Sequence, residues 1–268
     1  MAAMNHTDKG ILQVTRPHAR VVQPQGGRAA GPLIHLPTWS RLNVAARQWA
    51  EAGNGGDFFE IIQQRDGRVA AVMADVSGNG PSAAAPVSGL RWVLRQGLAR
   101  GESPGTVLCM LNDWLVRQQV QDQQVHDRFV TAVCVRLHPV SGDAEIASAG
   151  HLGPFVKRAR GGAEALPPSV GLALGIFPGQ SYREVAVELH PQDALVLVTD
   201  GITDRLATRT DPLGQEGLLN RLRRAQLSPE GICGALMGPS ARTAEDATVV
   251  VMQMPRRHRR ATPVAHAG

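Results

Sequence analysis

The alternation of short apolar runs with tight turns most constrains how this chain can fold. Two such runs, 58–64 and 68–74, flank Asp66-Gly67, and Asp-Gly is a strong signal for the turn of a β-hairpin. The apolar runs 129–137 and 144–149 are also separated by only a short turn. Strands joined this closely pair with their sequence neighbours, so we expect antiparallel sheets.

Helical periodicity is strongest in two adjacent segments. Apolar residues recur at helical spacing in 81–99, and a second helix is predicted after Ser103, with Pro104 at its first position. Because these helices are adjacent and do not alternate with strands, the pattern predicts an α+β body and not a doubly wound parallel sheet. The remaining predictions are short helices around 217–224 and 229–237 and strands at 155–157, 183–189, 194–199 and 247–252.

Composition limits the class of protein. The 268 residues are 43% hydrophobic, as in globular domains, and only 4% aromatic, which argues against stacking platforms for single-stranded nucleic acid. No run approaches the roughly 20 apolar residues of a membrane span, and the N-terminus lacks the apolar core of a secretory signal. Cys109, Cys134 and Cys233 are far apart in apolar segments, so we expect reduced core thiols in a cytoplasmic protein.

The net charge of +5 is concentrated at the two ends of the chain. We expect a flexible N-terminal arm over 1–38, one folded domain over 39–254, and a flexible basic tail over 255–268. Residues 41–254 carry 20 basic and 22 acidic side chains, so the folded part is close to neutral. Nucleic-acid binding is therefore not expected of the domain, and binding through the C-terminal arginines is a weaker alternative.

Acidic residues mark the ends of predicted strands. Asp57 precedes the first strand of the hairpin, and Asp75 follows the second. Asp200 follows a strongly apolar strand, and Glu245 and Asp246 precede the last strand. Carboxylates at strand ends can converge on one edge, where their repulsion would raise the pKa of some of them. A divalent cation removes that repulsion, and oxygen ligands favour Mg²⁺ or Mn²⁺ over zinc.

Seven short motifs occur in a fixed order across about residues 41–254. They are Gly55-Gly56-Asp57-Phe58-Phe59, Asp75-Val76-Ser77-Gly78-Asn79-Gly80, Phe129-Val130-Thr131, Ser148-Ala149-Gly150-His151, Gly171-Leu172-Ala173-Leu174-Gly175, Thr199-Asp200-Gly201-Ile202-Thr203-Asp204 and Glu245-Asp246-Ala247-Thr248. In this order the motifs resemble the PPM superfamily of metal-dependent Ser/Thr protein phosphatases, and within it the SpoIIE-like bacterial branch.

The resemblance implies an α-β-β-α sandwich, in which two antiparallel sheets face each other between outer helices. It also implies two Mn²⁺ or Mg²⁺ ions at one end of the sandwich, bridged by Asp75. Since the family has aspartate where this chain has Glu245, the identity of the last ligand stays open. The implied ligands are Asp57, Asp75, the Val76 carbonyl, Asp200, and either Glu245 or Asp246.

Such a centre needs no nucleophilic side chain, because water activated by the metals attacks the phosphorus. No catalytic side chain is therefore predicted, and the sequence does not identify substrate-binding residues. A cysteine-dependent phosphatase would need an arginine six positions after its cysteine, and none of the three cysteines has one. The residues thus favour the metal-dependent chemistry that the resemblance implies.

The resemblance further implies a phosphoserine/phosphothreonine protein phosphatase. Its implied substrate is a phosphorylated anti-sigma-factor antagonist of the STAS type, in a partner-switching pathway. A regulatory protein is expected to act in trans, through the two helices between 81 and 121. The alternative, which Glu245 favours, is a degenerate domain that binds a phosphoprotein without hydrolysing it.

Two interpretations of His151 are open. As a general acid it would protonate the leaving serine oxygen, and as a structural residue it would brace the turn through its ring nitrogens. Thr131, within an apolar strand, is expected to bond its hydroxyl to the backbone. Trp92 and Trp114, one on each strong helix, are expected to pack and not to bind a ligand.

Overall fold

The computed structural model describes residues 34–35, 41–49, 56–78, 83, 85–121, 128–166, 171–238 and 246–256. The domain predicted over 39–254 contains nearly all of them. The predicted arm 1–38 and tail 255–268 lie outside these ranges, apart from residues 34–35 and 255–256. Glu245 and Asn79 also lie outside the described residues.

The described strands form two sheets, and every strand pair within them is antiparallel. The six-stranded sheet has the order β1 (Ile34–His35), β2 (Asn43–Trp49), β11 (Ala247–Gln253), β10 (Ala194–Val198), β7 (Phe155–Lys157) and β8 (Ala163–Ala165). The five-stranded sheet has the order β3 (Phe58–Gln63), β4 (Val69–Val76), β5 (Val130–Leu137), β6 (Asp143–Ala149) and β9 (Val185–Glu188).

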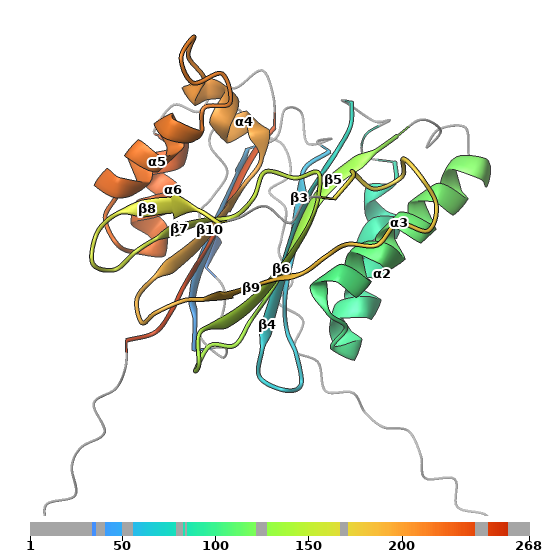
Figure 1. Ribbon diagram of the computed structural model, residues 1–268, viewed down its shortest axis with the longest axis horizontal. Coiled ribbons are helices and arrows are strands. Elements are labelled where there is room, and N and C mark those ends of the chain that lie inside the picture. Colours follow the sequence, from blue (N-terminus) through green and yellow to red (C-terminus); the bar gives the residue numbers. More distant parts are fainter. Residues whose placement is uncertain are drawn as a thin grey trace, which may run out of the picture.

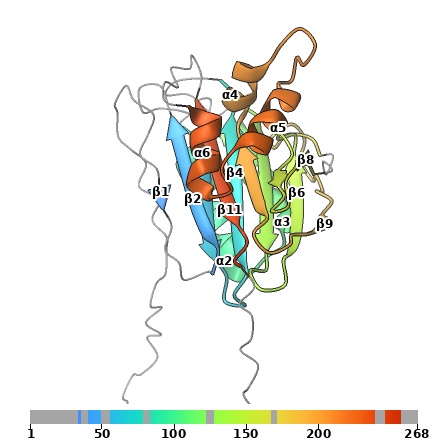
Figure 2. The same ribbon diagram turned by 90° about the vertical axis from the view of Figure 1, so that its left-hand side faces the viewer.

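Helices cover the outer face of each sheet, which gives four layers (Figures 1 and 2). Helices α2 (Val87–Arg100) and α3 (Pro104–Gln121) pack on the five-stranded sheet. Helices α5 (Gln215–Arg224) and α6 (Pro229–Met237) pack on the six-stranded sheet, and α4 (Asp200–Thr203) and η2 (Asp204–Leu206) follow β10 directly. The predicted α-β-β-α sandwich is confirmed. No helix in the described ranges is both long and apolar enough to cross a membrane.

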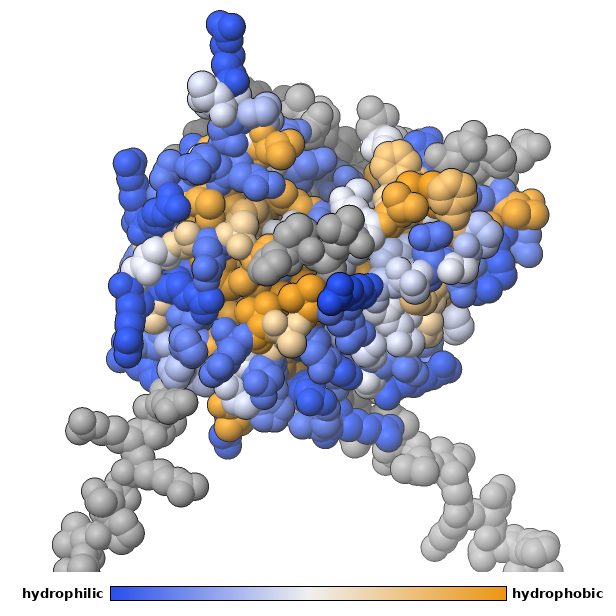
Figure 3. Space-filling model, in the orientation of Figure 1, coloured by the Kyte–Doolittle hydropathy of each residue, from blue (hydrophilic) through white to orange (hydrophobic). Residues whose placement is uncertain are grey.

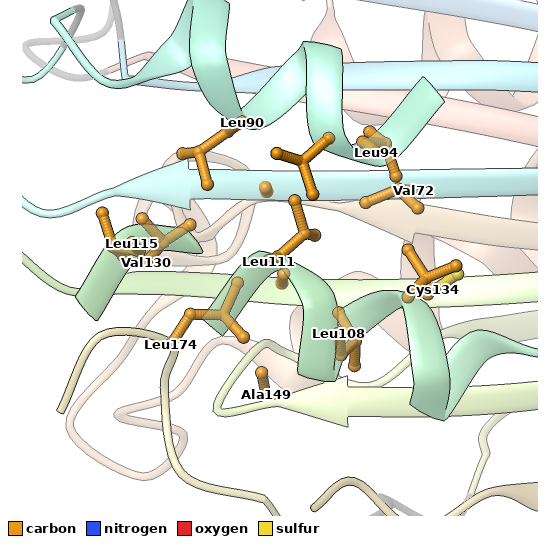
Figure 4. Close-up of a cluster of buried hydrophobic side chains, with 14 of the residues drawn as sticks. Val72, Leu90, Leu94, Leu108, Leu111, Leu115, Val130, Cys134, Ala149 and Leu174 are labelled. Carbon is orange, nitrogen blue, oxygen red and sulfur yellow. The ribbon is translucent and has the colours of Figure 1, made fainter. Parts of the chain in front are cut away.

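Strand β4 shows why the central strands are apolar on both faces. Val72 and its alternate neighbours pack against α2 and α3, whereas Met73 and its alternate neighbours pack between the sheets. Figure 4 shows Leu90 and Leu94 of α2 and Leu111 of α3 extending toward the sheet, with Leu94 next to Val72 in this view. A strand covered on both sides has no solvent face for a charge, so acidic residues are confined to its ends.

Several elements differ from the prediction. The first strong helix begins at Val87 and not at residue 81, because Pro86 has no N–H and disfavours helical backbone before it. Strand β2 was not predicted, since Arg47 and Gln48 interrupt its apolar pattern. The expectation that Trp92 packs is wrong, because its side chain is 64% exposed, whereas Trp114 packs over Gly89.

Candidate metal centre

The predicted acidic ligands within the described residues lie at one end of the sandwich. Strands β3 and β4 are antiparallel, so Asp57 before β3 and Asp75 near the end of β4 lie at the same end of the hairpin. Strands β10 and β11 are also antiparallel, which places Asp200 after β10 beside Asp246 before β11. Loops from both sheets therefore contribute carboxylates to this end.

Asp57 joins the two sheets through its side chain. One carboxylate oxygen, Oδ2, accepts hydrogen bonds from the hydroxyl of Thr199 at 2.7 Å and from the hydroxyl of Thr248 at 2.8 Å. The Asp57 main-chain carbonyl also accepts a bond from Gln48 Nε2 of β2, at 2.9 Å. Asp57 belongs to the β3 end of one sheet, and all three donors belong to the other. The carboxylate is thus held at the junction of the sheets.

The electrostatics of Asp57 reflect the neighbouring acids. Burial raises the pKa of Asp57 well above its usual range, and repulsion from Asp75 and, more weakly, Asp246 raises it further. The hydroxyls of Thr199 and Thr248 act in the opposite direction, because they stabilise the ionised form. Asp75 and Asp246 are therefore both close enough to Asp57 to disfavour its ionised form.

Glycine permits close backbone approach at this end. A Cβ on Gly56 would lie 2.6 Å from the Val76 carbonyl oxygen, so no side chain fits between that carbonyl and the residue before Asp57. A Cβ on Gly201 would lie 1.9 Å from the Asp246 carbonyl oxygen. The Val76 carbonyl therefore occupies a space that only glycine leaves open.

Asp200 is placed less centrally than Asp57. It is the first residue of α4 and directly follows Thr199, which bonds Asp57. Burial raises the pKa of Asp200, and the largest charge effect comes from Asp204, one turn along, and not from Asp57 or Asp75. Asp200 thus lies at the same end of the fold, but the charge that most affects its pKa is that of Asp204.

The donor set of this end fits a hard divalent cation. Neighbouring carboxylates and a main-chain carbonyl are the oxygen ligands that Mg²⁺ and Mn²⁺ favour. Among the residues that the structure describes, no group of three or more His, Cys, Asp or Glu side chains is arranged to hold an ion. The described residues therefore place suitable oxygen ligands at one end of the fold. A complete set of ligands around an ion stays a prediction.

His151 braces the two sheets. Its Nδ1 lies 2.8 Å from the Thr131 hydroxyl of β5, and its Nε2 lies 3.2 Å from the Val198 carbonyl of β10. Since a carbonyl only accepts, Nε2 carries the proton and Nδ1 accepts from Thr131. Burial lowers the pKa of His151 to about 4. The expectation that Thr131 bonds the backbone is wrong, because its partner is the His151 ring.

Sequence reasoning assigned no role to Thr199 and Thr248, although both occur in the quoted motifs. Both side chains are fully buried in or beside apolar strands, where a hydroxyl needs a partner. Thr199 Oγ1 also accepts from the Thr248 main-chain N–H at 2.9 Å. The sequence signal that could have identified them is a threonine, in or beside an apolar strand, close to each acidic strand end.

A comparison with known protein families shows whether these motifs reflect membership of a family. The family model described as Stage II sporulation protein E (SpoIIE) matches residues 65–255. The chain belongs to the SpoIIE family. This family consists of phosphatases of the PPM type, also called PP2C, so the resemblance drawn from the motifs is confirmed.

Solved structures of SpoIIE-type domains have the same fold. The RsbU and RsbW domains of Rv1364c from Mycobacterium tuberculosis match with a TM-score of 0.67 and 23% identity, over 89% of this chain and 65% of that one. The PP2C phosphatase domain of SpoIIE from Bacillus subtilis, with a fragment of its regulatory domain, matches with a TM-score of 0.67 and 19% identity, over 82% and 64%. RsbX in complex with magnesium matches with a TM-score of 0.62 and 17% identity, over 80% and 95%. This chain thus spans just under two thirds of the first and second of these.

The hydroxyl bonds to Asp57 predict a measurable contribution to stability. Replacing Thr248 by the isosteric valine removes one donor from a buried carboxylate. We expect Thr248→Val to lower the free energy of unfolding by about 1–3 kcal/mol. Urea unfolding in EDTA measures this change without bound metal. Thr210→Val, at an exposed threonine, is the matched control and should change stability by less than about 0.5 kcal/mol. Equal stability of the two variants would contradict the role of the Thr248 hydroxyl.

His151 predicts a pH dependence of stability. Its pKa is about 4 in the folded state and near 6.5 in the unfolded state, so between these values only the unfolded chain binds the proton. The contribution of His151 is therefore full above pH 6.5 and falls as the pH is lowered toward 4, by about 3 kcal/mol.

Urea unfolding of the metal-free protein at pH 7.5 and pH 5.0 measures this effect. His151→Gln should be less stable at pH 7.5 and should lose less stability at pH 5.0 than the unaltered protein. His190→Gln is the control, because the His190 side chain is 66% exposed. A pH dependence that is unchanged in His151→Gln would show that other groups cause it.

Proposed function

We propose that this chain is a Mn²⁺- or Mg²⁺-dependent phosphatase that hydrolyses phosphoserine and phosphothreonine in a protein. One observation carries the proposal: Asp57, Asp75 and Asp246 come from both sheets and lie at one end of a SpoIIE-family fold, where Asp75 and Asp246 both raise the pKa of Asp57. A divalent cation stabilises the ionised form of neighbouring carboxylates most strongly where they are shielded from water.

The residues that would hold the ions are the predicted ones. Two divalent cations would supply an activated water and would neutralise the negative charge of the phosphoryl oxygens. The Glu245-Asp246 pair would complete the shell from the start of β11. The proposed ligands are Asp57, Asp75, the Val76 carbonyl, Asp200, and either Glu245 or Asp246.

The surrounding residues orient these ligands. The hydroxyls of Thr199 and Thr248 leave Asp57 little freedom to rotate, since both bond the same oxygen. His151 is neutral at pH 7, and both of its ring nitrogens have partners, so we propose a bracing role for it and no proton transfer to the leaving group. Catalysis in this proposal thus depends on positioned ligands and water.

The surface beside the centre suits a protein substrate. Phe129, just before β5, is 46% exposed, and its N–H donates to the hydroxyl of Ser77, the residue after the proposed ligand Val76. The loop between β8 and β9 exposes Leu172, Ile176 and Phe177 and pairs with β5 through Leu174 and Val130. Figure 3 shows hydrophobic side chains on this face of the molecule. Exposed apolar residues near a site supply contact area for a folded partner.

The motif resemblance supports a STAS-type substrate, and the neighbours' names support a signalling role. One neighbour contains RsbU and RsbW domains, and another is described under the bacterial stressosome, a modular signalling system. We therefore propose a phosphorylated STAS-domain anti-sigma-factor antagonist as the substrate. A cytoplasmic location and a regulator that acts in trans on α2 and α3 belong to the same proposal.

Hydrolysis of para-nitrophenyl phosphate during a Mn²⁺ titration tests the metal-dependent reaction. We expect activity only with Mn²⁺ or Mg²⁺ and a loss of at least about 100-fold in Asp75→Asn, since the bridging carboxylate is removed. Asp66→Asn is the matched control, because Asp66 lies in the turn at the opposite end of the same hairpin. If the unaltered protein and Asp75→Asn are equally inactive at every Mn²⁺ concentration, the alternative of a non-catalytic phosphoprotein-binding domain is correct.

The substrate class predicts a preference for intact protein. A serine-phosphorylated STAS-domain protein should be hydrolysed with a kcat/KM at least about tenfold above that of a peptide carrying the same phosphoserine, because only the folded protein contacts the exposed loop. Release of phosphate, measured for both substrates, checks this. Equal kcat/KM values would contradict a role for the folded surface and leave the phosphatase chemistry intact.

A further inference from the structure

Ser77, the residue after the proposed ligand Val76, makes three hydrogen bonds with the two residues that precede β5. Its N–H donates to the Phe129 carbonyl at 2.9 Å, and its hydroxyl accepts from the Phe129 N–H at 3.1 Å. Its carbonyl accepts from Nη1 of Arg128 at 2.9 Å. The two peptide groups on either side of Ser77 are therefore both fixed.

The first of these peptide groups aims the ligand carbonyl. The Val76 carbonyl and the Ser77 N–H belong to one planar trans peptide, in which they point in opposite directions. Since the N–H points toward Phe129, the Val76 carbonyl points away from it. A Cβ on Gly56 would lie 2.6 Å from that carbonyl oxygen, so the oxygen is directed toward the residue that precedes Asp57.

The second peptide group depends on Arg128. A Cβ on Gly78 would lie 2.1 Å from Arg128 Nη1, so the guanidinium lies directly against the chain at Gly78. Gly78 also has a φ of +96°, a backbone conformation that other residues rarely adopt. The segment after Val76 is thus shaped to receive the guanidinium of Arg128.

Arg128 is itself anchored by α3. Gln119 Nε2 donates to the Arg128 carbonyl at 2.5 Å and to the Gly175 carbonyl at 3.1 Å. The backbone from which the Arg128 side chain extends is therefore fixed by a helix that packs on the sheet. A guanidinium held at its base and bonded at its tip has a defined geometry.

We propose that Arg128 is a positioning residue for the metal centre, which holds the segment Val76-Ser77-Gly78 so that the Val76 carbonyl faces the ions. This inference rests on the proposed function, because it assigns Arg128 a role toward the proposed ligand. Residues that orient metal ligands without touching the metal commonly change its affinity about 10–100-fold when they are replaced.

The sign of the effect separates this role from a purely electrostatic one. Arg128 carries a positive charge near the proposed ions, and loss of a like charge would strengthen cation binding. Loss of a positioning residue would weaken it. The direction of the change in Mn²⁺ affinity therefore distinguishes the two roles without any measurement of activity.

Isothermal titration of the full chain with Mn²⁺ provides the test. We expect Arg128→Gln to weaken Mn²⁺ binding at least about tenfold and Arg128→Lys to give an intermediate value, because lysine keeps one donor but lacks the planar fork. Arg136→Gln is the matched control: Arg136 lies near the other end of β5, and its Nη1 also donates to a main-chain carbonyl, that of Gly101, at 2.9 Å. The Mn²⁺ affinity of Arg136→Gln should match that of the unaltered protein.

Each outcome decides the proposal. Unchanged or tighter Mn²⁺ binding in Arg128→Gln, or an equal loss in Arg136→Gln, would overturn it. If Arg128→Gln does not fold, the affinity of Arg128→Lys decides in the same way. An unaltered protein that binds no Mn²⁺ would overturn both this inference and the proposed function. Mn²⁺ binding that depends on Arg128 without phosphatase activity would refute only the proposed function.

Discussion

The bonds from Thr199 and Thr248 to the buried Asp57 carboxylate are the interaction on which the arrangement of this protein depends. Burying an ionised carboxylate is costly unless hydrogen bonds compensate, and both compensating hydroxyls come from the opposite sheet. The two sheets must therefore be packed in their final positions before Asp57 is satisfied. The acidic end thus forms only as a consequence of the whole sandwich.

The residues that stabilise the fold and the residues of the proposed centre occupy different parts of the strands. The middle of each central strand contributes to two apolar layers, one between the sheets and one beneath the helices. The acidic residues of the proposed centre lie at strand ends, where glycines at positions such as 56 and 201 let the backbones approach. Repulsion among the carboxylates is thereby confined to a region whose position the apolar layers already determine.

The parts of the fold that follow from local pattern were predictable. The β3–β4 hairpin follows from Asp66-Gly67, and the start of α3 follows from Ser103 and Pro104. Strand β2 was not predictable, because its polar residue Gln48 is buried and bonds the Asp57 carbonyl, a long-range contact that local pattern does not show. The same limit applies to the site: its carboxylates are visible as strand-end residues, whereas their partners depend on which sheets meet.

Arg128 illustrates why residues that position a ligand are difficult to predict from the sequence. An arginine before an apolar strand has no distinctive sequence signal, and its importance comes from a carbonyl 51 residues earlier in the chain. The repulsion that raises the pKa of Asp57 is also the interaction that a cation would remove. If a cation binds the folded chain at this end, as proposed, its binding would also raise the folding stability. The segment that directs the Val76 carbonyl toward this end would then affect both metal affinity and stability, although that carbonyl carries no net charge.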